Sequence, residues 1–176
     1  ENILKAENLY VSYDNVNIVR NISFDLKKQE FLGIVGESGC GKTTLLRALM
    51  MLKRRGNSMK GRLLFQGKDL TKFSEEELRI LRGEGISMIP QNAFAAMDST
   101  KTISSFFHET VQMHSSQKVA RKDSDRLASD LMKKLLLQDT ERILKSYPFE
   151  LSGGMCQRVM IAAAMLNSPK LILGDE

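Results

Sequence analysis

Cysteine is scarce in this chain, and long apolar runs are missing. Only two cysteines occur among 176 residues, Cys40 and Cys156, which excludes a disulfide scaffold and fits a reducing compartment. The longest apolar run covers residues 159–166, whereas a helix that spans a bilayer needs about 20 apolar residues. No N-terminal stretch combines the basic flank and apolar core of a signal peptide. We therefore expect neither a secreted scaffold nor a chain with its own membrane anchor.

The charge balance of the chain is modest. The net charge is +5, and the longest basic block covers only residues 53–55. This surplus suits anionic ligands or an acidic membrane surface, and by itself it does not argue for nucleic acid. With 42% hydrophobic and 27% charged residues, the composition is that of a globular protein, and the length suits one domain of the usual ~100–200 residues.

The N-terminal third has the patterns of β-strands. Ile22, Phe24 and Leu26 alternate with polar residues, which predicts a half-buried strand. Residues 31–35 form a continuous apolar run closed by Gly36, which predicts a strand buried on both faces. Further strands are expected at 62–66, between Gly61 and Gly67 as turn residues, at 86–89 before Pro90, and at 171–173 as a last buried strand.

The middle of the chain, from about residue 92 to 150, has helical spacing instead. Ser74 and Glu77 already form a capping box that should open a short helix before it. One helical face is predicted from Ile103, Phe106, Phe107 and Thr110, and another from Leu127, Leu131 and Leu135. Residues 115–125 are polar and predict a loop or a frayed helix end, and a last helix is expected over 157–166.

Residues 36–43 read Gly-Glu-Ser-Gly-Cys-Gly-Lys-Thr and match the phosphate-loop pattern G-x-x-x-x-G-K-[ST]. Glycines let the loop turn its N–H groups toward a polyphosphate, and the following helix adds the positive end of its dipole. Lys42 should reach the β- and γ-phosphates, while Thr43 offers its hydroxyl to Mg²⁺. A chance Gly-rich turn would lack the predicted strand before it and the helical residues 45–52 after it. The sequence therefore predicts a nucleotide site.

Three further features have both a simple structural interpretation and a functional one. Cys40 inside the loop is either a small residue in a variable position, which we favour, or a redox-sensitive thiol. The stretch Leu-Ser-Gly-Gly at residues 151–154 is either a plain capped helix start or a second anion site at a helix N-terminus. Asp175 and Glu176 follow the last predicted strand, where a solvated acidic end is the simple alternative.

Taken in order, these motifs resemble the ATP-binding-cassette (ABC) ATPases over essentially the whole chain. Four motifs occur in the same order as in that family: the phosphate loop, Gln91 after a strand, the signature at 151–157 and the Walker B strand at 171–176. Residues 147–162 look like the subunits that power dipeptide, oligopeptide and nickel importers, although those usually carry His where Phe149 stands and Arg where Cys156 stands.

The resemblance implies an α/β fold of the P-loop NTPase type. A RecA-like core would carry an N-terminal antiparallel β-subdomain and an inserted α-helical subdomain. Residues 1–91 would hold the β-subdomain and the first part of the core, 92–154 the helical subdomain with the signature at its end, and 155–176 the second part of the core. The chain ends before the family's D-loop and switch histidine, so we expect a C-terminally truncated cassette. His108 and His114 precede the signature and are expected to be surface helix residues.

The same resemblance implies an ATPase site that uses ATP and Mg²⁺. Thr43, Gln91 and Asp175 would hold Mg²⁺, Glu176 would act as general base, and Gln91 and Lys42 would be catalytic as well. Tyr13 would stack on the adenine; half-buried strand packing is the alternative for this side chain. The residues that would contact nucleotide are Tyr13, Gly36, Glu37, Ser38, Gly39, Cys40, Gly41, Lys42, Thr43, Thr44, Ser152, Gly153 and Gly154.

Partners follow from the resemblance too. A second ABC ATPase subunit would bind head to tail, so that Ser152, Gly153 and Gly154 contact the γ-phosphate held by that subunit. Integral membrane permease subunits would dock a coupling helix beside the helical subdomain, and an extracytoplasmic solute-binding protein would act indirectly. The apolar contact would come from Phe94, Met97, Phe106, Phe107 and Met113, unless these residues are core. The chain would lie at the cytoplasmic face of the cell membrane, with no nucleic acid partner.

Two other functions compete with a transporter subunit. A non-transport ABC ATPase, of the DNA-repair or translation type, would share the motifs. DNA-repair members insert long coiled coils, and too few residues separate Gln91 from Leu151 for that. A phosphate-loop kinase or GTPase would need no signature, and the GTP-type N-K-x-D motif does not occur. We expect a transporter subunit first and another ABC ATPase second.

Overall fold

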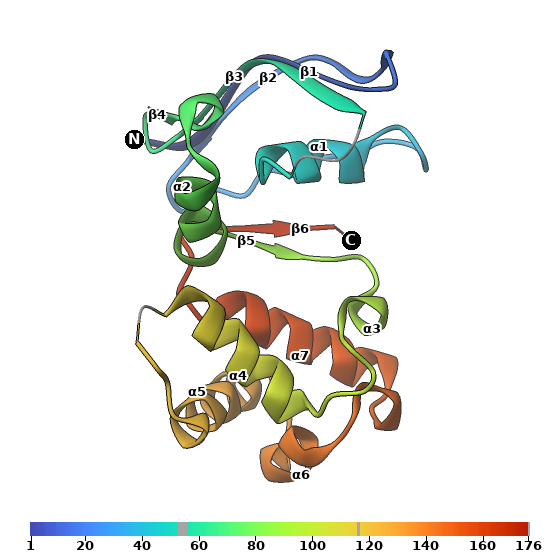
Figure 1. The fold of residues 1–176 in the computed structure, drawn as a ribbon. Helices are drawn as coiled ribbons and strands as arrows, with labels where there is room; N and C mark the ends of the chain where they lie inside the picture. The colour runs from blue at the N-terminus through green and yellow to red at the C-terminus, as the bar shows by residue number, and fades with distance from the viewer. Residues whose placement is uncertain (53–55, 116, 176) are drawn as a thin grey trace. The chain divides into compact units, whose positions relative to one another are not determined.

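The computed structural model describes residues 1–52, 56–115 and 117–175. These residues form two compact units (Figure 1), of which the first comprises residues 1–82 with Asp175 and the second residues 83–174. The basic block at 53–55 and Glu176 lie outside the described residues. The division into three segments that the sequence predicts, at residues 1–91, 92–154 and 155–176, remains a prediction. Among the described residues, no helix is both long and apolar enough to cross a membrane.

An antiparallel sheet in the order β2-β1-β3-β4 organises the first unit. Its strands are β1 (Asn2–Tyr13), β2 (Val16–Lys27), β3 (Asn57–Phe65) and β4 (Lys68–Asp69). Asp14 and Asn15 join β1 to β2, and both have positive φ, of 45° and 66°. These two residue types tolerate the left-handed region that a two-residue hairpin turn requires. The half-buried strand predicted around Ile22 to Leu26 is confirmed as part of β2.

A bulge in β1 changes which of its residues face the core. Leu4 and Ala6 are buried in the first half of the strand and Leu9 and Val11 in the second, a change from even to odd positions. The change occurs at Asn8, which has φ 48° and lies at a register shift in the pairing with β3. An extra residue shifts the side-chain alternation by one, and so both halves of β1 bury their apolar side chains.

Gly61 is opposite this bulge and lies inside β3, so the prediction that it ends a strand is wrong. Its φ is +100°, and a Cβ at this position would collide with the carbonyl oxygen of Asn8 and approach that of Glu7 to 2.6 Å. β3 can run past the bulge because glycine brings no side chain there.

The predicted buried strand at residues 31–35 is also wrong. No strand is found there, and Phe31 is 100% and Val35 98% exposed. A strand buried on both faces needs hydrogen-bonded neighbours. The four strands of the first unit pair with one another, and among the described residues none of them pairs with this segment.

Helices α1 (Lys42–Leu49) and α2 (Glu75–Ile80) complete the first unit, with the 3₁₀ turn η1 (Leu70–Lys72). The π-turn η2 (Leu81–Gly85) begins in the first unit and ends in the second. The predicted capping box is confirmed. Glu77 N donates to Ser74 Oγ at 3.3 Å, and Ser74 N donates to Glu77 Oε2 at 2.7 Å. The hydrogen bonds that the backbone N–H and the hydroxyl of Ser74 donate to the Glu77 carboxylate lower the pKa of this carboxyl. The stabilisation is therefore present at neutral pH and is lost as the pH falls through that lowered pKa.

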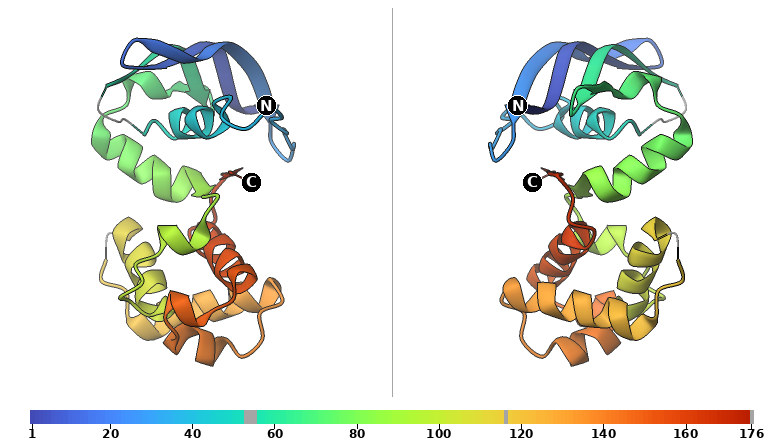
Figure 2. Two further views of the ribbon diagram at one scale, coloured as in Figure 1. Left: turned by 90° about the vertical axis from the view of Figure 1, so that its right-hand side faces the viewer. Right: turned by 90° about the vertical axis from the view of Figure 1, so that its left-hand side faces the viewer.

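The second unit pairs a short parallel sheet with a cluster of helices. β5 (Ile86–Ile89) lies parallel to β6 (Leu171–Gly174). The helices, light green to red in Figure 2, pack around a common apolar core that includes the fully buried Phe107, Met132 and Val159. They are α3 (Ala93–Ala96), α4 (Ile103–His114), α5 (Arg121–Lys134), α6 (Thr140–Lys145), the 3₁₀ turn η3 (Pro148–Glu150) and α7 (Gly153–Met165).

Several predicted details of this unit need correction. α5 begins at Arg121, inside the segment predicted to be a loop or frayed end, and α7 begins at Gly153 because Ser152 caps it there. β6 is buried mainly at Leu173, since Ile172 is 40% exposed. His108 is half-buried, with its Nδ1 3.1 Å from Ser124 Oγ, and it is not a simple surface residue.

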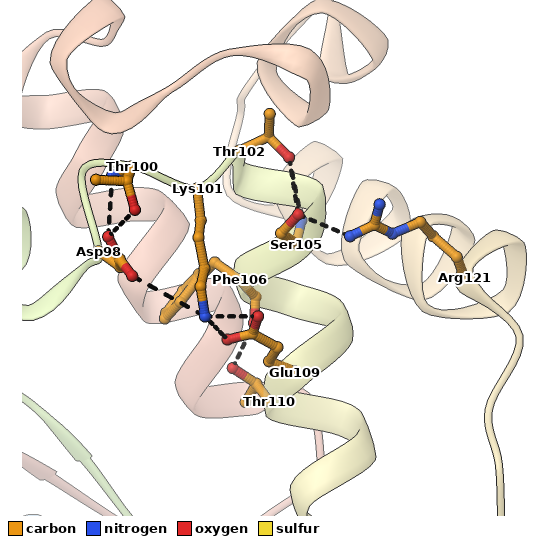
Figure 3. A network of polar contacts seen from close by, with 9 residues as sticks. All are labelled: Asp98, Thr100, Lys101, Thr102, Ser105, Phe106, Glu109, Thr110 and Arg121. Atoms are coloured by element: carbon orange, nitrogen blue, oxygen red, sulfur yellow. Dashed lines mark hydrogen bonds and ion pairs between the residues drawn. The ribbon is translucent and has the colours of Figure 1, made fainter.

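Polar contacts hold the chain between α3 and α4 (Figure 3). Asp98 Oδ1 accepts hydrogen bonds from the backbone and hydroxyl of Thr100, at 2.9 and 2.6 Å. Lys101 Nζ donates to both carboxylate oxygens of Glu109 at 2.8 Å. Thr102 caps α4 by accepting from Ser105 N. The start of α4 is therefore fixed by side chain to backbone and ionic contacts.

Replacing each of two glycines by alanine tests the importance of the bulge in β1. Ala at Gly61 or Gly67 has to adopt positive φ, which costs about 1–2 kcal/mol. Only at Gly61 does the added Cβ also meet backbone oxygens, because nothing lies within 4 Å of the position at Gly67. Gly61→Ala should therefore lower the free energy of unfolding by at least about 1 kcal/mol more than Gly67→Ala. Urea denaturation measures both, and equal losses would show that the close approach to Asn8 is unimportant.

Candidate nucleotide-binding site

The loop at residues 36–43 connects β2 to α1 in the first unit, and residues 36–40 are exposed. Gly41 precedes α1 with φ 103°, and a Cβ there would lie 2.9 Å from Ile18 Cγ2. Within the described residues no side chain caps α1. The first N–H groups of this helix are consequently left for a ligand, and an anion is favoured there by the helix dipole.

Lys42 bends back over the loop. Its Nζ donates to Gly36 O at 2.8 Å and to Glu37 O at 2.9 Å. These contacts hold the ammonium group against the loop backbone, and the loop is narrow enough that a Cβ on Gly36 would lie 2.6 Å from Cys40 Sγ. A cation and a helix N-terminus therefore lie on one short segment, which is the arrangement that polyphosphate binding needs.

Thr43 and Asp175 are brought together from positions far apart in the sequence. Thr43 Oγ1 donates to Asp175 Oδ1 at 2.9 Å, and Asp175 is only 7% exposed. Both groups supply oxygen, the ligand that Mg²⁺ prefers, and Mg²⁺ usually keeps several of its waters. One hydroxyl and one carboxylate beside a phosphate loop thus fit Mg²⁺ well.

Tyr13 ends β1 and pairs with Val16 and Asn57 on the neighbouring strands. It is half-buried, while Val16 is exposed. Ile18 lies two residues after Val16 in β2. The sequence analysis did not select it, yet its side chain lies against Gly41. Its position in an alternating strand offered no signal that it would lie against the phosphate loop.

Arg82 is a second residue that the sequence analysis missed. Its Nε and Nη2 donate to Met50 O and Met51 O, at 2.9 and 2.5 Å, just after α1 ends. A cation at a helix C-terminus stabilises the last carbonyl groups. Arg82 thereby holds the helix that carries Lys42 and Thr43, and one arginine in a charged segment gives no pattern that predicts this.

Thr44 lies in α1, and the remaining predicted site residues that the structure describes belong to the second unit. Gln91 is exposed and lies between β5 and α3. Ser152 caps α7 by accepting from Met155 N at 3.3 Å, as predicted, and Gly153 and Gly154 open the helix with nothing within 4 Å of a Cβ at either position. Glu176, the predicted general base, lies outside the described residues. The structure therefore groups Lys42, Thr43 and Asp175 in one unit and supplies an open, capped helix start in the other.

Comparison with known proteins matches residues 19–176 to the ABC transporter family. The chain is 38% identical over 159 residues to the metal-staphylopine import system ATP-binding protein CntD of Staphylococcus aureus, a match that covers 90% of this chain and 58% of that protein. It is also 38% identical over 182 residues to the dipeptide transport ATP-binding protein DppD of Bacillus subtilis, covering 100% and 54%. The chain thus spans a little over half the length of these curated relatives.

Solved structures agree on the fold. A dimeric bacterial ABC transporter cassette matches with a TM-score of 0.85 at 24% identity, over 97% of this chain and 72% of that one. CbiO1 from Clostridium perfringens, part of an ABC transporter complex, matches with a TM-score of 0.79 at 24% identity, over 100% and 66%. The fold is an ABC-type P-loop NTPase fold, as predicted. The chain belongs to the ABC transporter family.

The contact between Thr43 and Asp175 yields a stability prediction. Thr43→Val keeps the shape of the side chain but leaves a nearly buried carboxylate without this donor, which should cost about 1–3 kcal/mol of unfolding free energy. Thr43→Ser keeps the hydroxyl and should cost much less. Thr44→Val serves as the matched neighbour, and chemical denaturation without nucleotide measures all three. If Thr43→Val and Thr44→Val were equally stable, the bond to Asp175 would contribute nothing.

Proposed function

We propose that this chain is the nucleotide-binding part of an ATPase subunit that energises a membrane importer for peptides, nickel or a related small solute. The observation that carries the proposal is the phosphate loop with Lys42 folded over it and the Thr43–Asp175 pair beside it at 2.9 Å. The relatives' names, which refer to dipeptide transport and to metal-staphylopine import, support the importer class. A non-transport ABC ATPase is not favoured, because those relatives are transport proteins.

In the proposed reaction the residues of the first unit bind and polarise the triphosphate. Lys42 Nζ exchanges its bonds to Gly36 O and Glu37 O for oxygens of the β- and γ-phosphates, and the N–H groups that open α1 hold the same phosphates. Thr43 and Asp175 would hold Mg²⁺, which would supply positive charge to neutralise the phosphoryl oxygens. Tyr13 stacks on the adenine, a contact that discriminates weakly between bases.

Attack on the γ-phosphate needs a base and a closed site. Glu176 takes the proton of the attacking water as the water oxygen bonds to the γ-phosphorus and the bond from that phosphorus to the β–γ bridging oxygen breaks, so that ADP leaves. Gln91 would orient that water or touch Mg²⁺. Ser152, Gly153 and Gly154, at the open start of α7, complete the site of a second cassette arranged head to tail. Catalysis then comes from positioning and from dipoles directed at the developing charge.

The partners proposed for the assembly follow from this reaction. A second ABC ATPase subunit supplies the other half of each site, and permease subunits receive the conformational change at the cytoplasmic face of the membrane. A solute-binding protein outside the membrane acts through the permease. Met97 and Phe107 are buried in the core of the second unit, so of the residues predicted to meet the permease only Phe94 and Met113 are substantially exposed.

Removing the Lys42 ammonium group tests the nucleotide site. Charge-assisted hydrogen bonds contribute about 1.5–3 kcal/mol, so Lys42→Ala should weaken ATP binding by about ten- to 150-fold or abolish it. Isothermal titration calorimetry with MgATP measures the affinity. Lys60→Ala, at an exposed lysine of β3, is the control and should bind as the unaltered protein does. Undiminished affinity in Lys42→Ala would refute the phosphate-loop assignment.

The role of Glu176 is tested separately. In the gene product that contains these residues, Glu176→Gln removes the proposed base and should trap the ATP-bound dimer, because binding proceeds while hydrolysis stops. Size-exclusion chromatography with MgATP should then show a dimer, which ADP does not support. Glu141→Gln, at an exposed position at the start of α6, should behave as the parent. Turnover at the parent rate in Glu176→Gln would mean that another group is the base.

A further inference from the structure

The C-terminal end of α1 has a backbone conformation that glycine ordinarily supplies. Met51 has φ 53°, in the left-handed region that disfavours a residue with a side chain. Met51 N donates to Ala48 O at 2.8 Å, and Leu52 N donates to Arg47 O at 3.0 Å. These are the paired bonds of a Schellman motif, in which glycine is the usual residue at this position. A conformation of this kind persists only where its surroundings hold it in place.

Arg82 supplies that hold. The Schellman bonds use the carbonyls of Arg47 and Ala48, but not the two that follow at Met50 and Met51. Arg82 Nε donates to Met50 O at 2.9 Å and Nη2 donates to Met51 O at 2.5 Å. Because both nitrogens belong to one planar group, a single side chain fixes two consecutive carbonyls. The Arg82 side chain is only 22% exposed, and such bonds are stronger away from water.

The length of α1 makes its two ends depend on each other. Its eight residues form little more than two turns, or about 12 Å of helix, and so short a helix is not stable alone in water. Its first turn carries Lys42 and Thr43, and among the described residues no side chain caps it. If the last turn of α1 loosens, only about one turn is left to keep the phosphate-binding end in place.

We infer that Arg82 is a positioning residue for the bound nucleotide. By holding Met50 O and Met51 O, it keeps the first turn of α1 ordered before any ligand arrives. Lys42 Nζ and the open N–H groups then meet the triphosphate without an ordering step, which would otherwise weaken binding. This inference rests on the proposed function, which places the phosphates at that turn. Arg82 acts from the opposite end of the helix and is not a catalytic residue.

The test measures MgATP affinity by isothermal titration calorimetry, in the gene product that contains these residues and well below its melting temperature. Arg82→Ala should weaken binding by about tenfold, because part of the binding free energy is then used to order α1. Arg82→Lys keeps one cation but loses the planar pair of donors, and should weaken binding by only about threefold. Arg79→Ala is the matched control, since Arg79 pairs with Glu76 inside α2, and should bind as the parent does.

Hydrogen exchange separates positioning from folding. Without nucleotide, the amides of residues 45–52 should exchange about tenfold faster in Arg82→Ala than in the parent. The amides of β1 and β3 should be unchanged, because the apolar face of α1 stays buried at Leu45, Leu46, Ala48 and Leu49. MgATP should return exchange in α1 of the variant toward the rate of the parent, since the bound phosphates then order the helix.

Each other outcome identifies what is wrong. Parent affinity in Arg82→Ala, or an equal loss in Arg79→Ala, would overturn the inference and leave the phosphate-loop site intact. Faster exchange throughout the sheet would also overturn it, because Arg82 would then serve the folding of the whole unit. If Arg82→Ala does not fold, Arg82→Lys decides, and parent affinity in that variant would refute a positioning role. Absence of MgATP binding in the parent would overturn the proposed function, and the inference with it.

Discussion

Thr43 donates a hydrogen bond to Asp175, which lies 132 positions later in the sequence, and the chemistry proposed for the first unit depends on this one contact. It joins the first turn of α1 to the residue that follows β6. A nearly buried carboxylate needs a donor or a cation, because an unpaired charge in such surroundings is costly. Without nucleotide the hydroxyl of Thr43 meets that need, and with nucleotide Mg²⁺ would meet it. Under the proposed function, the same two oxygens would serve stability in one state and Mg²⁺ binding in the other.

The two helices assigned to phosphate differ in how their ends are satisfied. α1 begins after Gly41 with no side-chain cap among the described residues, whereas Ser152 caps α7. Neither helix carries an acidic residue in its first turn, a feature that they share with α3 and α4, while α2, α5 and α6 do carry one. Acids in the first turn stabilise a helix on their own, and a bound anion can replace them. α1 therefore depends more than α7 on a bound anion for stability at its N-terminus. At its C-terminus, the hydrogen bonds from Arg82 to Met50 O and Met51 O supply part of the missing stabilisation.

Local patterns in the sequence predicted the features that a few neighbouring residues determine. The capping box at Ser74, the cap at Ser152 and the phosphate loop before α1 depend on residues within a few positions of one another. The predictions for residues 31–35 and Gly61 were wrong because each depends on a distant strand: one needs a neighbour to pair with, the other lies opposite a bulge at Asn8. The contacts of Ile18 and Arg82 are likewise set by tertiary packing, and neither residue type is unusual at its position.

The two departures from the importer pattern, Phe149 and Cys156, lie at the same turn. Cys156 is 1% exposed, and its thiol donates to the carbonyl of Pro148, the residue next to Phe149. Burial raises the pKa of this thiol, which keeps it protonated and able to donate. An arginine could not occupy this buried position without a partner for its charge. The thiol of Cys156, a small neutral donor, therefore helps to hold the turn at Pro148. The turn in its place keeps the exposed ring of Phe149 in one orientation. Only Phe149 of the two adds apolar surface at this turn, because Phe149 is 64% exposed and Cys156 is buried.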